Sequence, residues 1–315
     1  MTDHYVVTGG AGFIGSAIVR SLLDEGARRV VVIDNLLTGR ESNLEQVRSS
    51  IDFQRADIRN YEEIAPVIRG AAVVFHEAAI PSVPRSIDEP LLSHEVNING
   101  TFNVFRAARE GAAGRVVYAA SSSAYGDTEV LPKVETMNPH PKSPYALQKL
   151  VGEYYASIFS AVYGLETVSL RYFNVYGPRQ DPTSPYSGVL SLFMKALLSG
   201  CPPTIFGDGE QSRDFTFVED VAALNLKAAR AAGVCGSMYN AGNGGRITLN
   251  EAWDLLQRIE GVRIAPNYGP PRSGDVRHSQ ADITAAVRDL AHAPRFSFEQ
   301  GMRLTLDWYR HSAAL

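Results

Sequence analysis

A glycine-rich turn near the start of the chain constrains the fold more than any other feature of the sequence. Residues 4–8 have the apolar pattern of a short buried strand, residues 9–15 read Gly-Gly-Ala-Gly-Phe-Ile-Gly, and apolar residues then recur at helical spacing. Gly9 permits a tight turn, Gly12 lets a pyrophosphate approach the backbone, and Gly15 lets the helix pack closely on the sheet. The helix N-terminus then offers unpaired N–H groups to phosphate. This order of elements predicts a dinucleotide-binding turn.

A second strand pattern, at residues 29–33, ends at Asp34, roughly 20 residues beyond Gly15. A carboxylate at this place can accept hydrogen bonds from both ribose hydroxyls of an adenosine and would repel a 2′-phosphate. No arginine follows it directly. The sequence therefore favours NAD over NADP. The alternative, a structural glycine turn in some other α/β protein, stays open at this point.

Strand patterns alternate with helix patterns through the first half of the chain, which calls for a parallel sheet with helices on both faces. Further strands are expected at Phe53 and at residues 73–76, 116–118 and 167–170. Helices are expected near residues 61–69, 93–111 and 145–163. We predict an α/β fold, a Rossmann-type doubly wound parallel sheet with a smaller mixed C-terminal substrate lobe.

From about residue 175 onwards, loops rich in Pro, Gly and charged residues separate shorter elements. We expect residues 1–174, with 213–240 returning to the sheet, to form the dinucleotide-binding domain. Residues 175–212 and 241–315 are expected to form the lobe that binds a nucleotide sugar. Open parallel sheets bind ligands at the carboxyl ends of their strands, and the candidate residues fall there. They are Gly9, Asp34, Asp57, Ala78, Ala79, Ser121 and residues 172–174.

Composition argues against several other classes of protein. With 45% hydrophobic and 20% charged residues and a net charge of −4, the chain gives no case for binding nucleic acid or a membrane surface. Its two cysteines, Cys201 and Cys235, are too few for a disulfide or metal framework, so no metal is expected. The first strand begins almost at Met1 and no apolar run approaches a membrane span. A cytoplasmic location is therefore expected.

A tyrosine and a lysine enter the helix pattern at residues 145–163, and a run of serines precedes them. Tyr145 and Lys149 are one helical turn apart and so share a helix face. Free tyrosine titrates near ~10, but a neighbouring cation favours the phenolate, so Lys149 is expected to lower the pKa of Tyr145 towards neutrality. Ser121 could relay or orient the proton. The alternative is an exposed helix with an aromatic flank.

Together, the glycine turn, Asp34, Ser121 and the Tyr145/Lys149 pair resemble the extended short-chain dehydrogenase/reductase family over essentially the whole chain. Further matches are residues 57–58, 97–101, 171–174, 207–209 and 213–215. Within that family the chain is most similar to the nucleotide-sugar 4-epimerases, especially the bacterial UDP-N-acetylglucosamine 4-epimerases. The segments that carry this closer resemblance are residues 82–87, 131–135 and 274–279.

The resemblance implies NAD as cofactor and a UDP-sugar as substrate, with Ser121, Tyr145 and Lys149 as catalytic residues. The implied cofactor-binding residues are Gly9, Gly12, Phe13, Ile14, Gly15, Asp34, Asn35, Asp57, Ile58, Ala78, Ala79, Asn97, Tyr145, Lys149 and Tyr172. The implied substrate-binding residues are Ser82, Ser122, Ser123, Asn174, Val189, Arg213, Arg272, Asp275 and Ser279. Glu77 stands where relatives usually carry an apolar residue, and we expect it to point away from the cofactor.

The resemblance further implies reversible inversion at C4 of a UDP-hexose through a 4-keto sugar. It also implies a homodimer that pairs the helices near 93–111 and 145–163. Ser123 stands where related dehydratases and decarboxylases carry an acid, which disfavours elimination and decarboxylation. Ser279 stands where epimerases limited to plain sugars carry a bulky tyrosine, so both acetylated and plain UDP-hexoses should fit.

Two alternatives stay open. A UDP-glucuronate 4-epimerase on the same scaffold would need a cation facing C6 of the sugar, for which Arg85 and Arg179 are candidates. A non-catalytic NAD-binding protein would be expected to have a broken Ser/Tyr/Lys set, and the set is intact here. The function expected is NAD-dependent C4 epimerisation of UDP-GlcNAc/UDP-GalNAc and UDP-Glc/UDP-Gal.

Overall fold

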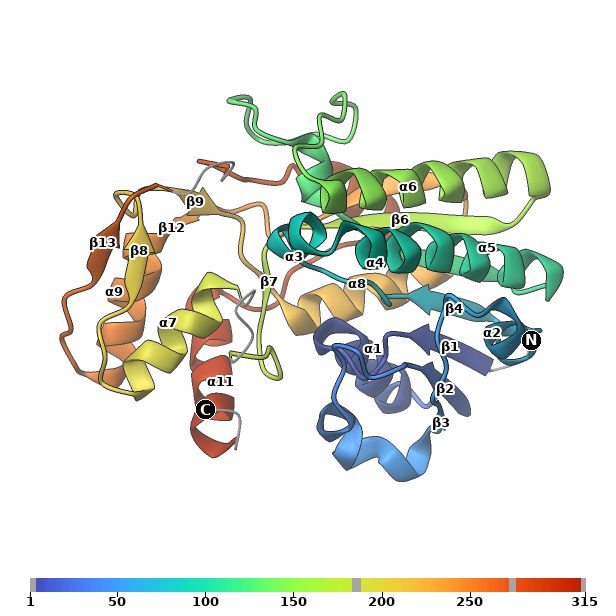
Figure 1. The fold of residues 1–315 in the computed structure, drawn as a ribbon, viewed down its shortest axis with the longest axis horizontal. Helices are drawn as coiled ribbons and strands as arrows, with labels where there is room; N and C mark the ends of the chain where they lie inside the picture. Colours follow the sequence, from blue (N-terminus) through green and yellow to red (C-terminus); the bar gives the residue numbers. More distant parts are fainter. Residues whose placement is uncertain (1–3, 183–187, 272–275, 313–315) are drawn as a thin grey trace.

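The computed structural model describes residues 4–182, 188–271 and 276–312 (Figure 1). A parallel sheet of seven strands, in the order β11-β6-β5-β4-β1-β2-β3, forms its larger part. The strands are β1 (His4–Thr8), β2 (Arg29–Ile33), β3 (Asp52–Gln54), β4 (Val73–His76), β5 (Arg115–Ser121), β6 (Glu166–Tyr172) and β11 (Ser237–Ala241). The strand order reverses between β1 and β4, which opens a crevice at their carboxyl ends. The doubly wound α/β sheet expected from the sequence is confirmed.

The strands of this sheet are apolar on both sides because helices cover both of its faces. Successive residues of β1 enter different cores. Val6 packs in the core that holds α2, α5 and α6, whereas Val7 packs in the core that holds α1 and α8. These helices are α1 (Phe13–Asp24), α2 (Tyr61–Ile68), α5 (Thr101–Glu110), α6 (Pro144–Tyr163) and α8 (Val218–Arg230).

The helix expected at 93–111 is not a single regular helix. It consists of the end of α4 (Pro90–His94), a π-helical turn η2 (Glu95–Gly100) and α5. Within the turn, the buried Asn97 accepts a hydrogen bond from the Ile80 N–H (2.8 Å) and donates to the Gln148 side chain (2.8 Å). These tertiary bonds hold the wider turn, and π turns of this kind occur frequently at functional sites.

The remaining connections of the larger part are short helical segments. They are η1 (Glu41–Ser50) after β2, α3 (Val83–Asp88) after β4, and η3 (Ser122–Tyr125) after β5.

The smaller part of the molecule is built around a separate core that contains Phe193, Trp253 and Tyr309. Its elements are β7 (Val175–Tyr176), α7 (Val189–Leu198), β8 (Thr204–Phe206), β9 (Ser212–Arg213), β10 (Thr216–Phe217), β12 (Ile247–Thr248), α9 (Leu249–Glu260), β13 (Asn267–Gly269) and α11 (Phe298–His311). The strands pair as β7 with β10, β8 with β13 and β9 with β12. Figure 1 shows this part to one side of the main sheet, beyond the carboxyl ends of its strands.

The chain crosses between the two parts more than once. After β10, α8 packs on α1 and β11 pairs with β6 at the edge of the main sheet. Further on, α10 (Thr284–Leu290) also packs in the core shared by α1 and α8. The exact division into two domains stays a prediction.

Across the described ranges, none of the helices combines the length and the apolar character needed to cross a membrane.

Candidate active site

The glycine turn joins β1 to α1 at the carboxyl edge of the sheet. Gly9 has a φ of +69°, and a Cβ there would lie 2.6 Å from the backbone nitrogen of Ala78, just beyond β4. A Cβ on Gly15 would lie 2.2 Å from the Gly9 carbonyl oxygen. Among the described residues, a Cβ on Gly12 would meet only that same oxygen, at 3.0 Å. The turn thus needs glycine at Gly9 and Gly15, and it leaves room in front of Gly12 for an approaching group.

Asp34 lies beside this turn at the end of β2, where the sequence places it. Its two carboxylate oxygens accept hydrogen bonds from the backbone N–H groups of Ala11 (2.9 Å) and Leu36 (2.8 Å). Burial raises the pKa of Asp34, while these two bonds lower it. The bonds fix the carboxylate against the turn, in a position suited to accept ribose hydroxyls.

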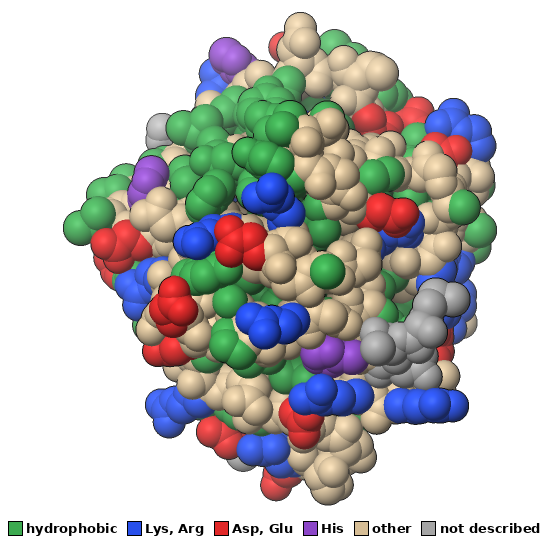
Figure 2. Space-filling model, turned by 90° about the vertical axis from the view of Figure 1, so that its right-hand side faces the viewer, with side chains coloured by type: hydrophobic (Ala, Val, Ile, Leu, Met, Phe, Trp, Pro, Cys, Tyr) green, Lys and Arg blue, Asp and Glu red, His purple; other side chains and the backbone are tan. Residues whose placement is uncertain are grey.

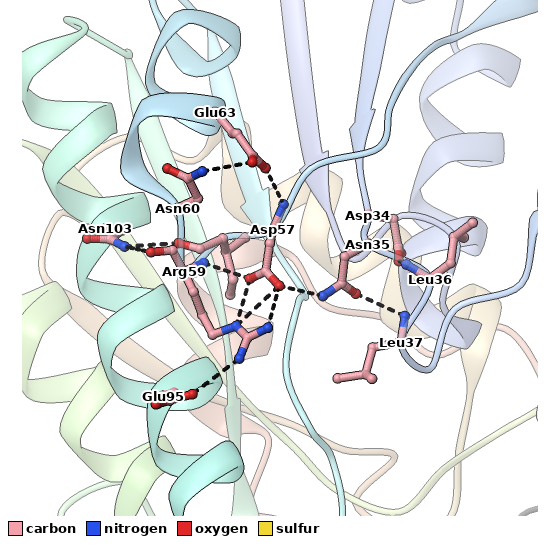
Figure 3. A network of polar contacts seen from close by, with 11 residues as sticks. Asp34, Asn35, Leu36, Leu37, Asp57, Arg59, Asn60, Glu63, Glu95 and Asn103 are labelled. Carbon is pink, nitrogen blue, oxygen red and sulfur yellow. Dashed lines mark hydrogen bonds and ion pairs between the residues drawn. The ribbon is translucent and has the colours of Figure 1, made fainter.

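The residues predicted to hold the adenine end form a polar network next to Asp34 (Figure 3). Asn35 donates to the Asp57 carboxylate (2.9 Å), and Arg59 bridges Asp57 (2.8 Å) and Glu95 (3.2 Å). Burial acts to raise the pKa of Asp57, but the hydrogen bonds from Arg59 and Asn35 outweigh it and lower the pKa to about 2. Ile58 is buried beside this network. The sequence did not single out Arg59, which holds Asp57 in place.

The predicted catalytic pair, Tyr145 and Lys149, lies in the first turns of α6. The Ser143 side chain caps the helix by accepting from the Ala146 N–H (3.2 Å), and Pro144 occupies the first helical position, where no N–H is needed. Tyr145 and Lys149 follow on one face, and the Lys149 Nζ donates to the Ala119 carbonyl of β5 (2.8 Å). The structure therefore brings this helix face against the end of β5.

The Ser121 hydroxyl, at the end of β5, interacts electrostatically with the Tyr145 phenol. It also accepts from the Ser123 hydroxyl (2.8 Å) and the Ser123 N–H (3.2 Å). Burial raises the pKa of Tyr145 to about 12, and the interaction with Ser121 acts in the opposite direction. The lowering expected from Lys149 is not found. Burial also lowers the pKa of Lys149 to about 8.

Glu77 does not point away from the site, so that expectation is wrong. Its carboxylate accepts a hydrogen bond from the Tyr172 hydroxyl (2.7 Å) and interacts electrostatically with Lys149. Burial raises the pKa of Glu77 to about 7, although Tyr172 and Lys149 act to lower it. The reason is topological, since β6, which ends at Tyr172, runs only two strands away from β4 in the sheet. A glutamate within an otherwise apolar strand end was the available sequence signal.

Three predicted substrate residues line one cavity of about 580 Å³ in the smaller part of the molecule. Asn174 follows β6, Val189 begins α7, and Arg213 lies in β9. Further lining residues include Leu192, Phe193, Cys201, Phe206 and Leu249. The cavity has largely apolar walls with the amides of Asn174 and Gln211 and the cations Arg213 and Lys195, which is the character of a nucleotide site.

The other predicted substrate residues lie around α6 and β9. Ser82 caps α3 by accepting from the Arg85 N–H (3.1 Å). Ser122 and Ser123 lie in the turn after β5. Ser279 is half-buried and donates its N–H to the Ser212 carbonyl (3.0 Å) in front of β9. Arg272 and Asp275 lie outside the described residues.

The remaining cofactor candidates surround the glycine turn. Phe13 and Ile14 form the first turn of α1, whose N–H groups lack partners within the helix. Ala78 and Ala79 follow Glu77 after β4, and Asn97 ties η2 to this segment. The glycine turn, the carboxylate of Asp34 and the Tyr145/Lys149 pair all lie along the carboxyl edge of the sheet. These residues fit an extended dinucleotide with a ribose at one end and a reactive ring at the other. Within the described ranges, no cluster of three or more His, Cys, Asp or Glu side chains could hold a metal ion.

Comparisons with known proteins agree with the fold and the site described above. Residues 5–242 match the model of the NAD dependent epimerase/dehydratase family. A putative UDP-glucose 4-epimerase of Methanocaldococcus jannaschii is 37% identical over 309 residues, covering 98% of each chain. The structure of a UDP-N-acetylglucosamine 4-epimerase from Methanobrevibacter ruminantium, in complex with UDP-N-acetylmuramic acid, superimposes with a TM-score of 0.93 at 37% identity, covering 98% of each chain.

A second solved structure is that of a UDP-glucose 4-epimerase from Thermotoga maritima with UDP-glucose. It has a TM-score of 0.92 and is 38% identical, again covering 98% of each chain. The likeness therefore extends over both parts of the molecule and is not confined to the glycine turn. On its fold, its site and these matches, the chain belongs to the NAD-dependent epimerase/dehydratase family.

Proposed function

We propose that this protein catalyses the NAD-dependent, reversible inversion of C4 in a UDP-hexose through a transient 4-keto sugar. The observation that carries the proposal is that Tyr145 and Lys149 lie one helical turn apart on α6, against the end of β5, where Lys149 donates to the Ala119 carbonyl and the Ser121 hydroxyl acts on Tyr145. The cavity that contains Asn174, Val189 and Arg213 supplies a place for the nucleotide. The UDP-hexose epimerases that match the whole length of the chain support the same reading.

In this mechanism Tyr145 acts as the general base in its phenolate form, which would accept the proton of the C4 hydroxyl, directly or through the Ser121 hydroxyl. NAD, when bound, supplies the acceptor and later the donor of the C4 hydride. Lys149, whose ammonium donates to the Ala119 carbonyl, would hold the ribose at the nicotinamide end. The inversion is complete when Tyr145 returns its proton to the C4 oxygen and C4 regains a hydride on its opposite face.

Inversion requires the sugar to turn while the nucleotide stays in place. Arg213 and Arg272 would clamp the diphosphate, and Asn174 and Val189 would hold the uridine end. Arg213 already donates to the carbonyls of Ser212 (2.9 Å) and Arg277 (3.1 Å), so its guanidinium is oriented by the backbone.

We further propose that acetylated and plain UDP-hexoses are both substrates. The small Ser279 side chain leaves room for a 2-acetamido group, and the hydroxyls of Ser82, Ser122 and Ser123 are candidate sugar contacts. Ser123, where related enzymes carry an acid, donates to Ser121 and so supports the proton path. The absence of a carboxyl at this position disfavours elimination.

A UDP-glucuronate substrate is the second candidate, and the two arginines considered for it have other partners. Arg85 pairs with Glu89 on its own helix (3.2 Å), and Arg179 donates to Gln46 near β2 (3.0 Å). With these partners, neither guanidinium is favoured as the cation that would bind the C6 carboxylate of the sugar. This geometry supports a neutral hexose.

We also propose a homodimer formed by α5 and α6. Four large side chains spaced along one stripe of α6 are about half exposed or more: Leu147 (51%), Tyr154 (55%), Ile158 (49%) and Val162 (66%). Figure 2 views the molecule from the side towards which α5 and α6 extend in Figure 1, and hydrophobic side chains gather at one end of that face. An apolar stripe of this extent is typical of a protein interface. The expected cytoplasmic location stays a prediction.

The experiment that tests the function is product analysis after separate incubations with UDP-glucose, UDP-GlcNAc and UDP-glucuronate, first without and then with added NAD. The proposal predicts the C4 epimers of the first two sugars with no net NADH. Conversion of UDP-glucuronate alone would favour the second candidate. No conversion of any sugar with NAD present would contradict both.

A further inference from the structure

Glu77 is a charged residue of the candidate active site that has no role in the proposed mechanism. Its N–H donates to the Thr8 carbonyl (3.1 Å), and the next residue, Ala78, lies against the glycine turn at Gly9. The backbone on either side of the carboxylate is therefore held by β1 and by the turn that follows it. The Glu77 side chain therefore extends from a fixed backbone.

A chain of hydrogen bonds joins Glu77 to two further elements. The Asn225 side chain of α8 donates to the Val221 carbonyl (2.9 Å) and to the Tyr172 hydroxyl oxygen (2.8 Å). Tyr172 in turn donates its proton to Glu77 (2.7 Å). The Tyr172 hydroxyl also lies 3.1 Å from the Asn225 side-chain oxygen, so the Glu77 carboxylate is the nearer of its two acceptors. It fixes the Tyr172 phenol, a residue implied at the nicotinamide end.

The charged and titratable groups around Glu77 come from three other elements. Tyr145 and Lys149 face it from α6, Tyr118 from β5 and Tyr172 from β6. Glu153 on α6 adds a second negative charge that acts on Lys149. On its own strand, burial lowers the pKa of His76 to about 3, so that ring is neutral. Lys149 is therefore the positive charge that Glu77 faces.

We propose that Glu77 is a positioning residue of this active site, whose carboxylate holds the Tyr172 phenol and counters the Lys149 ammonium at the nicotinamide end of the groove. The charge has a second consequence. Oxidised nicotinamide is cationic and the reduced ring is neutral, so a carboxylate at this end favours binding of the oxidised form. This preference keeps the resting enzyme ready to accept a hydride, and its role in turnover rests on the proposed epimerase function.

The direct test measures the dissociation constants of NAD and NADH for the cofactor-depleted protein, by isothermal titration calorimetry, in the wild type and in Glu77→Gln. The glutamine keeps an acceptor for Tyr172 and removes only the charge. The ratio of NAD to NADH affinity is expected to fall by about tenfold, the effect of one pKa unit of charge interaction. Glu77→Asp, which keeps the charge, should restore most of the ratio. An unchanged ratio in Glu77→Gln would overturn the inference.

A second readout is the pH profile of kcat. Because the Glu77 charge raises the pKa of Tyr145, the acid limb of the Glu77→Gln profile should move to lower pH. If Glu77 had only a structural role, its replacement would lower stability or NAD affinity but would not move the acid limb of the kcat profile. In the wild type, the NAD to NADH affinity ratio should also rise between pH 6 and pH 8, and the rise should be smaller in Glu77→Gln, which separates ionisation of Glu77 from loss of the Lys149 charge in the same range. A flat wild-type ratio, or an equal rise in both proteins, would contradict the inference. These binding measurements need no sugar, so they remain decisive if the wild type epimerises no UDP-hexose, the result that would remove the proposed function.

Discussion

The surroundings of Tyr145, the proposed base, keep its phenol protonated. Burial raises the pKa of its phenol to about 12, and the Lys149 ammonium is turned towards the Ala119 carbonyl. Sequence spacing correctly placed the two side chains on one helix face, but it could not show where the ammonium points. A phenolate in this site therefore depends on further positive charge, which the oxidised cofactor brings to the nicotinamide end.

Removing the Tyr145 hydroxyl should separate catalysis from folding. Tyr145→Phe is expected to lower kcat by about 10²- to 10⁴-fold, the range typical of a lost general base, while the fold and NAD binding persist. Steady-state kinetics and NAD titration of the same preparation check this. Tyr154→Phe, on the exposed stripe of the same helix, is the matched control and should retain wild-type kcat. A Tyr145→Phe enzyme with near-normal kcat would exclude Tyr145 as the base.

The choice of sugar is predicted to depend on the volume at Ser279. Ser279→Tyr should abolish turnover of UDP-GlcNAc and spare that of UDP-glucose, because the ring would fill the space left for the acetamido group. Ser279→Ala removes only the hydroxyl and should accept both sugars. The kcat/KM values for the two substrates are the measurement. Equal activity of Ser279→Tyr on both sugars would refute the prediction that the volume at Ser279 determines the choice of sugar.

Elements were predicted better than the contacts between them. The strand, glycine turn and helix at the start of the chain follow from local patterns, since φ of Gly9 and the packing of Gly15 need glycine whatever the neighbours are. The π turn at η2 was missed because it depends on the bonds from Asn97 to Ile80 and Gln148, which lie far away in sequence. The orientation of Glu77 was missed for the same reason.

Buried His76 ties β4 to β1 and α5, and this makes stability depend on pH. Its ring nitrogens contact the hydroxyls of Thr8 (2.8 Å) and Thr101 (3.0 Å). Burial lowers the pKa of His76 to about 3 in the folded state, against about 6.5 when unfolded. The unfolded chain thus binds more protons between these values, so the stabilisation is complete above pH 6.5 and is lost as the pH falls.

We expect the free energy of unfolding to decrease by up to about 1.4 kcal/mol per pH unit below 6.5 through this one group. Melting temperatures at pH 7.5, 6.5 and 5.5 test it. His76→Gln should be less stable at pH 7.5 but should show a shallower loss towards pH 5.5. His94→Gln, which changes an exposed histidine, should follow the wild type. Parallel curves for His76→Gln and the wild type would contradict the assignment.

At the scale of the whole molecule, the site exists because the sheet brings distant segments to one edge. The carboxyl ends of β1, β2, β4, β5 and β6 carry the glycine turn, Asp34, Glu77, Ser121 and Tyr172. The alternation of strands and helices was sufficient to predict this edge. The nucleotide cavity was predicted only through the family resemblance, because its short strands and loops leave no periodic pattern to follow.

The proposed dimer is also a property of the whole molecule. Ile158→Arg should place a charge in the middle of the apolar stripe of α6 and convert the dimer to a monomer, because an unpaired charge in a buried interface is costly. Sedimentation velocity across a range of protein concentrations is the measurement. Val262→Arg, at an exposed apolar position after α9, should not change the sedimentation coefficient. A monomeric wild type would remove the proposal.

The most direct test of the proposed reaction follows a deuterium label at C4 of UDP-glucose, with no NAD added beyond that bound to the protein. If the hydride taken from C4 returns to the opposite face of the same carbon, the product UDP-galactose keeps the deuterium at C4, and mass spectrometry and NMR will find it there. Loss of the label to water with inversion would mean that C4 exchanges a proton with solvent, and the account of hydride transfer beside Tyr145 would be wrong.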